Sequence, residues 1–200
     1  MKKLSLLFVF LVSQFTLFAC STQVVEPQAT SNENKAHRLT VVSSGDPADV
    51  LPAFTTYTWS AEHRNVLSSM PKKGKQELKN YLSEEIKYNL SQKGYQYTDN
   101  AAQADVVIGF LFALEDAIAD RTIQEKFGLL PGLSGTDMTN PRYEKGSFLF
   151  AVFDNKDNLI YWRTAAQGFV DLEKDKEDKS SDRFQKILSM MLNGFPRAGH

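Results

Sequence analysis

ADVVIGFLFAL, residues 104–114, is an almost unbroken apolar run of the length of one β-strand. A strand that is buried on both faces, or that lies in the middle of a sheet, has this composition. We therefore expect residues 104–114 to form an interior strand, and the other predicted elements are placed around it.

A hairpin is predicted further along the chain. Residues 146–154 and 159–170 are strand-like runs, and Asn155-Lys156-Asp157-Asn158 lies between them. Asn and Asp tolerate the positive φ angles of a tight turn, so we expect an antiparallel pair. Runs rich in β-branched and aromatic residues predict shorter strands at residues 39–44, 54–59 and 95–98.

Two amphipathic helices are predicted, at residues 75–93 and 182–193, and each is followed by a glycine that can end it. The first carries an apolar residue at every fourth position: Leu78, Leu82, Ile86 and Leu90. Because each helix has a single apolar stripe, both must cover the sheet. The predicted fold is α+β: a mostly antiparallel sheet with two amphipathic helices packed on one face.

The start of the chain has the layout of a secretory leader. Lys2 and Lys3 precede an apolar stretch that is short for a permanent membrane span. Leu17-Phe18-Ala19-Cys20 resembles the lipobox of bacterial lipoproteins, which implies cleavage of residues 1–19 and acyl chains on Cys20. Ser21 resembles a sorting residue that allows export to the outer membrane. The alternatives are an ordinary cleavage site or an uncleaved anchor.

The rest of the chain has the composition of one domain on a tether. Cys20 is the only cysteine, so no disulfide, thiolate metal site or cysteine nucleophile is expected. Residues 20–37 are polar and predict a flexible tether, and residues 38–200 have the length of a single α+β domain. Without the leader, 21 basic and 24 acidic residues give a net charge of −3, which offers no basic field for nucleic acid.

Several segments, spaced over about residues 41–196, together resemble the uncharacterised bacterial lipoprotein family catalogued as domain of unknown function 4136. They are Asp46-Pro47, Tyr57-Thr58-Trp59, Lys93-Gly94-Tyr95, Ala104-Asp105-Val106-Val107-Ile108, Tyr143-Glu144-Lys145-Gly146, Trp162-Arg163 and Phe195-Pro196. The resemblance implies an envelope lipoprotein with no established activity. The chain departs from the family pattern at residues 150–153, where Phe-Ala-Val-Phe replaces an aliphatic-Asp pair, while Asp154 is kept.

Structural roles can account for those positions. Asp105 precedes the predicted interior strand and could accept hydrogen bonds from neighbouring backbone donors. Arg163 could pair with a carboxylate such as Asp154 or Asp116. Large semi-polar side chains suit the edges of a sheet core: these are Tyr57, Trp59, Tyr95 and Trp162.

Signals for catalysis are weak. Ser69 and Lys72 have Ser-x-x-Lys spacing, but Pro71 disfavours the helix that this motif needs. Glu115 and Asp116, followed by Asp120 and Arg121, predict a solvated strand end, and alternation would place the first two on opposite faces. The three histidines show no zinc-ligand spacing: they are His37, His63 and His200. No metal or cofactor is expected.

The sequence therefore favours a non-enzymatic lipoprotein, held by acyl chains at the periplasmic face of the outer membrane, that binds an unidentified envelope protein or periplasmic ligand. Glycine and proline punctuate residues 124–143, which predicts a long loop as the contact surface. Its apolar residues either contact the partner or fold back on the core: Phe127, Leu129, Leu130, Leu133 and Met138. The alternative is an envelope hydrolase of peptidoglycan or lipid that uses some of Asp105, Glu115, Asp116 and Arg163.

Overall fold

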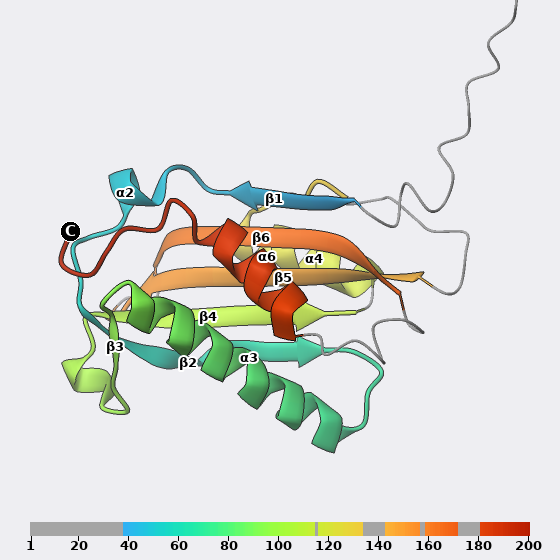
Figure 1. The fold of residues 1–200 in the computed structure, drawn as a ribbon, viewed down its shortest axis with the longest axis horizontal. Helices are drawn as coiled ribbons and strands as arrows, with labels where there is room; N and C mark the ends of the chain where they lie inside the picture. The colour runs from blue at the N-terminus through green and yellow to red at the C-terminus, as the bar shows by residue number, and fades with distance from the viewer. Residues whose placement is uncertain (1–37, 115, 134–142, 157–158, 172–180) are drawn as a thin grey trace, which may run out of the picture.

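The computed structural model describes residues 38–114, 116–133, 143–156, 159–171 and 181–200 (Figure 1). The predicted leader, Cys20, Ser21 and the tether lie outside the described residues, as do Glu115 and Met138. Within the described ranges, no helix combines the length and the hydropathy that a membrane crossing requires.

A six-stranded open sheet forms the centre of the fold, in the order β1-β6-β5-β4-β2-β3 (Figure 1). As predicted, residues 104–114 supply an interior strand, which lies between β2 and β5. The hairpin prediction is also confirmed, because β5 and β6 pair antiparallel. The strands are β1 (Leu39–Ser43), β2 (Thr56–Leu67), β3 (Gln96–Tyr97), β4 (Val106–Ala113), β5 (Tyr143–Asp154) and β6 (Ile160–Asp171).

The sheet is mixed, which corrects the prediction of a mostly antiparallel one. β2 runs parallel to both of its neighbours, β3 and β4. The reason is the long helix α3 (Lys72–Gln92), which follows β2 and carries the chain back along the sheet. After such a crossover the next strand runs in the same direction as the strand before the helix.

Two helices cover one face of the sheet, as the sequence predicts (Figure 1). They are α3 and α6 (Ser181–Met191). Gly94 ends α3 with a φ of +92°, a left-handed conformation that favours glycine. The short helix α2 (Pro47–Val50) and the 3₁₀ turn η1 (Ala101–Gln103) lie in connections between strands.

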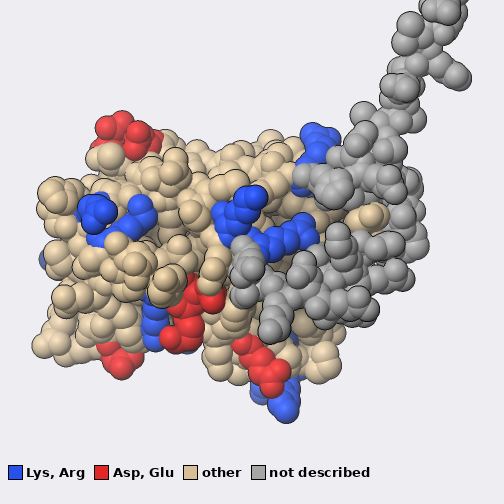
Figure 2. Space-filling model, viewed as in Figure 1, with Lys and Arg blue, Asp and Glu red and all other residues tan. Residues whose placement is uncertain are grey.

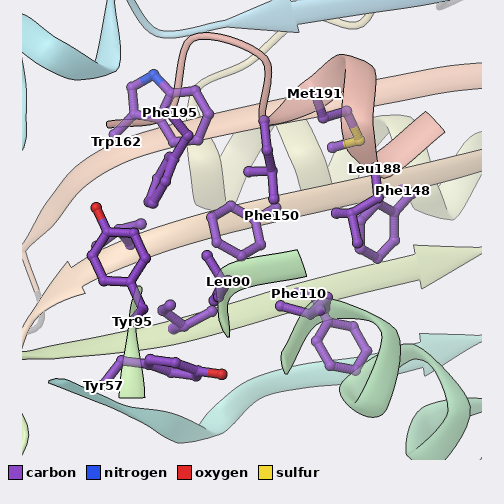
Figure 3. Packing of buried hydrophobic residues seen from close by; sticks show 14 of the residues in the cluster. Tyr57, Leu90, Tyr95, Phe110, Phe148, Phe150, Trp162, Leu188, Met191 and Phe195 are labelled. Carbon is purple, nitrogen blue, oxygen red and sulfur yellow. The ribbon is translucent and has the colours of Figure 1, made fainter. Parts of the chain in front are cut away.

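The larger core lies between this helical layer and the sheet (Figure 3). Leu82, Ile86 and Leu90 of α3 are at most 1% exposed, and each such side chain contributes about 1.5–3 kcal/mol on burial. They belong to one cluster with aromatic residues of the sheet and of the C-terminal segment, and Figure 3 shows Leu90 among these rings. The labelled rings are Tyr57, Tyr95, Phe110, Phe148, Phe150, Trp162 and Phe195.

A third long helix, α4 (Asp116–Phe127), covers the opposite face and was not predicted. Ile123 and Phe127 of α4 pack there against β4, β5 and β6. The predicted solvated strand end at residues 115–121 is therefore wrong, because the chain turns into a helix at Asp116. Residues 124–127, predicted as loop, belong to the same helix.

β2 is longer than predicted and contains a bulge. Its register shifts between Trp59 and Arg64, so that four residues of β2 lie opposite Gly109 of β4. A Cβ atom at Gly109 would lie 2.7 Å from the backbone oxygen of His63. A glycine therefore interrupts the apolar run of β4 because the bulge of β2 passes directly over it.

Candidate functional site

Residues 124–143 were the predicted contact surface, and the structure buries three of the four described apolar residues proposed as contacts. Phe127, Leu129 and Leu133 are at most 7% exposed, whereas Leu130 is 64% exposed. Phe127 and Leu129 pack on the second face of the sheet. Burial favours the second reading of the sequence for these three residues, that they fold back on the core. Leu130 alone of the four described residues has an exposed side chain.

A buried polar network holds this segment to the sheet. The Lys145 side chain is 1% exposed, and its Nζ lies 2.9 Å from Asp120 Oδ2 of α4. Gln167 Nε2 donates to Asp120 Oδ1 at 2.6 Å, and Gln167 Oε1 accepts from the Leu133 backbone N–H at 3.1 Å. Ser147 Oγ also accepts from Gln167, at 2.9 Å. The network thus joins α4, β5, β6 and the segment that follows α4.

Sequence reasoning missed this network. The buried face that α4 covers carries three polar side chains: Lys145, Ser147 and Gln167. Lysine is almost never fully buried unless it is paired, so a lysine at an inward-facing strand position could have indicated a buried ion pair. Its partner Asp120 could not be found, because the helix that presents it was not predicted. The ionised groups satisfy one another, which is the expected arrangement for a buried charge.

Two of the carboxylates proposed for a hydrolase, Asp105 and Asp116, lie far apart. Asp105 lies just before β4 and Asp116 just after it. Eight residues of strand place the two ends roughly 26 Å apart at about 3.3 Å per residue. Arg163 is on β6, which is separated from β4 by β5. The structure does not bring these three residues into one site.

Asp105 has the structural role that the sequence suggests. Its Oδ2 accepts the backbone N–H groups of Thr55 and Thr56, both at 2.9 Å, and also their hydroxyl groups. The two backbone hydrogen bonds, with the hydroxyls of Thr56 and Thr55, lower the pKa of the Asp105 carboxyl below its ordinary value. The carboxylate thus fixes the start of β2 beside the start of β4.

The predicted pairing of Arg163 with Asp154 is wrong. Asp154 lies opposite Val106, on the face covered by α3, and accepts from the Tyr161 hydroxyl at 2.7 Å. Arg163 lies opposite Ala151, on the face covered by α4. Its guanidinium lies against Gly128, 3.1 Å from where a Cβ atom would be, at the C-terminal end of α4. A cation is stabilising at that end of a helix.

Other family-like residues tie the C-terminal segment to the core. The Tyr95 hydroxyl donates to the Pro196 carbonyl at 3.1 Å, and Lys93 Nζ donates to the Phe195 carbonyl at 2.8 Å. Burial raises the pKa of Tyr95 to about 12, so the phenol stays neutral. The Trp162 indole N–H donates to the Gly45 carbonyl at 3.0 Å. These side chains are engaged in holding the fold.

The remaining sequence motifs do not assemble a catalytic group among the described residues. Lys72 opens α3 directly after Pro71, so Ser69 lies outside the helix. His63 stacks on Phe153, with ring centroids 4.9 Å apart. Within the described ranges, no three His, Cys, Asp or Glu side chains gather closely enough to bind a metal ion. Figure 2 shows basic and acidic side chains interspersed on the face of α3 and α6, without a broad field of one sign.

Comparison with solved structures finds similar chains at low sequence identity. A PelC dodecamer from Paraburkholderia phytofirmans matches with 10% identity and a TM-score of 0.49, over 82% of this chain and 100% of that chain. A DUF4136 family protein from Bacteroides thetaiotaomicron matches with 14% identity and a TM-score of 0.47, over 79% and 97%. The search of curated proteins gave no match.

The family comparison is more direct. The family described as "Domain of unknown function (DUF4136)" matches residues 41–197. This range covers β1 through the C-terminal segment, including both helical layers. The chain therefore belongs to the DUF4136 family.

Proposed function

We propose that the protein is an envelope lipoprotein, anchored through Cys20 at the periplasmic face of the outer membrane, that acts as a non-enzymatic binding module. The proposed localisation rests on the lipobox-like sequence that ends at Cys20 and on Ser21 after it. Several acyl chains on one residue hold a protein far more firmly than a single chain does. The tether of residues 20–37 then lets the domain reach away from the lipid.

One observation carries the binding role: the polar residues of the family pattern are engaged in the fold. Asp105, Tyr95 and Trp162 each use their polar atoms on backbone groups of neighbouring segments. A hydrolase needs reacting groups within hydrogen-bond reach of one another. Asp105 and Asp116, the two described carboxylates considered for that role, stand at opposite ends of β4, which supports a module that binds over one that catalyses.

The proposed contact surface is centred on Leu130. The side chain is 64% exposed, while its neighbours Leu129 and Leu133 are buried and fix the backbone on either side. An apolar side chain presented by a fixed backbone loses little conformational entropy on binding. Leu130 is therefore the described residue of this segment through which a partner would be recognised.

The test compares two equally exposed leucines. A photo-crosslinking residue at position 130 is expected to capture a specific envelope partner in intact cells, and Leu130→Asp, in a chain without the crosslinking residue, should abolish co-purification of that partner. Leu159, also 64% exposed, is the matched control: a crosslinking residue there should not capture this partner, and Leu159→Asp should leave its co-purification unchanged. Equal crosslinks at both positions, or none at position 130, would reject this surface.

A further inference from the structure

Aromatic and basic side chains meet where α3 packs along β2 (Figure 1). Trp59 of β2 and Tyr97 of β3 are half-buried neighbours, with ring centroids 6.1 Å apart. The Arg64 guanidinium lies over the Trp59 ring at 5.6 Å, and Lys87 Nζ lies over the Tyr97 ring at 4.2 Å. The bulge in β2 brings Arg64 back beside Trp59, five positions earlier in sequence.

Arg64 has no acceptor among the described residues. Its Nε is fully buried and makes no hydrogen bond there, and no salt bridge joins Arg64 to a described carboxylate. A guanidinium carries five N–H donors in a fixed fork, and a donor that is removed from water without an acceptor is unfavourable. Among the described residues, the guanidinium contacts the Trp59 ring while its Nε–H has no acceptor.

Lys79 of α3 adds a second cation without a counter-charge in this part of the structure. Burial, and then the positive charge of Arg64, lower its pKa, and no carboxylate acts in the opposite direction. Lys87 differs, because its Nζ lies 3.1 Å from Glu84 Oε1. Two neighbouring cations that lack an anion repel each other. An anion bound at the Arg64 guanidinium, on the side of β2 that α3 packs against, would oppose that repulsion.

The position is open along the edge of the sheet. β3 pairs only with Thr56 and Tyr57 of β2, so no described strand covers the outer edge of β2 from Thr58 onward. Arg64 and Trp59 both stand on that uncovered stretch, and both are half-buried rather than enclosed. A ligand can approach this stretch from the side without displacing a strand.

We propose that Arg64 and Lys79 anchor an oxyanion-binding site at the open edge of β2, which takes the carboxylate or phosphate group of a ligand whose remainder contacts Trp59 and Tyr97. A guanidinium stacked on an indole presents two parallel N–H groups, which match two oxygens of one carboxylate or phosphate. The Lys79 ammonium supplies a further donor. The site is independent of the Leu130 surface and of membrane anchorage.

Nuclear magnetic resonance of the ¹⁵N-labelled full chain in detergent tests the site, with inorganic phosphate and acetate as probes. The chain has two tryptophans, and Trp162 is 1% exposed with its indole N–H bonded to Gly45, so it serves as the internal reference. The expected result is a saturable shift of the Trp59 indole and Arg64 Nε–H signals with at least one probe, while Trp162 stays constant. Response to one probe alone assigns the preferred oxyanion.

Substitutions separate the site from general charge effects. Arg64→Gln and Lys79→Gln should weaken binding of the probe at least about tenfold, and Arg64→Lys should weaken it while keeping the charge. Lys87→Gln is the matched control, because Lys87 already has a carboxylate partner and its loss should leave binding unchanged. Without probe, Lys79→Gln should not lower the urea midpoint, since it removes a repulsion.

Three results would overturn the proposal. The first is a linear shift that sodium chloride at equal ionic strength reproduces. The second is equal weakening by Lys87→Gln and Arg64→Gln. The third is a lower urea midpoint for Lys79→Gln with unchanged binding, which would give Lys79 a purely structural role.

Discussion

Gly109 shows how one residue permits the bulge of β2. A Cβ atom there would approach the His63 backbone oxygen to 2.7 Å and the Phe153 ring to 3.0 Å. We expect Gly109→Ala to lower the free energy of unfolding by about 1–3 kcal/mol, because backbone must move. Urea denaturation measures the change.

Gly74 in α3 is the matched control for that substitution. The nearest atom to its added Cβ would be 4.0 Å away, and alanine is the better helix former, so Gly74→Ala should stabilise by about 0.5–1 kcal/mol. A destabilisation of the same size at both positions would show that the His63 bulge does not set the requirement at Gly109.

Asp105 makes a pH-dependent contribution to stability. Hydrogen bonds from the Thr55 and Thr56 backbone, with their hydroxyls, lower its pKa in the folded chain below the ordinary value of 3.8. Its contribution is therefore present above that value and is lost as pH falls through the folded pKa. The stability difference between the wild type and Asp105→Asn should be larger at about pH 6 than at about pH 3. A difference that is constant with pH would contradict this role.

That Asp105 accepts backbone hydrogen bonds could be predicted from its place before a strand, but its partners could not, because Thr55 and Thr56 lie at the start of another strand about 50 residues earlier in the chain. The partner of Arg163 could not, because which face of a strand a residue occupies depends on register. Asp154 and Arg163 are close in sequence but stand on opposite faces of the sheet. Arg64 was missed for a related reason, since only the bulge in β2 returns it to Trp59.

At the scale of elements, α4 is joined to the sheet by the ion pair of Asp120 and Lys145. Asp120→Ala should lower the free energy of unfolding by about 3 kcal/mol, because it removes the carboxylate that lies 2.9 Å from the buried Lys145 ammonium. The double variant Asp120→Ala/Lys145→Met should recover most of that loss, since it removes both charges. Urea denaturation of the two single variants and the double variant measures the coupling. Additive losses would show that the pair does not hold α4.

The elements were predictable to different degrees. α3, α6 and the β5–β6 hairpin follow from apolar periodicity and turn composition, which are local properties. α4 also carried a local signal, because Ala119, Ile123 and Phe127 recur at four-residue spacing and are all buried. This helical signal was overlooked, because the adjacent carboxylates suggested a strand end and the glycines after Phe127 suggested a loop.

For the whole molecule, the direction of strand pairing could not be read from local patterns. β2 is parallel to β4 because α3 intervenes between them in the chain. β4 and β5 pair antiparallel, and the apolar composition of these strands does not indicate which direction a pair will take. The assembled domain buries one core under α3 and α6 and a second under α4. With no cysteine among residues 38–200, these cores hold the domain without a disulfide.

We propose that this two-sided domain stands outside the cytoplasm on a lipid anchor. Mass spectrometry of the protein purified from native membranes tests that claim most directly. We predict that its N-terminal peptide begins at Cys20 and carries acyl chains on both the sulfur and the amine. A peptide that begins at Met1, or a Cys20 with a free thiol, would contradict the account.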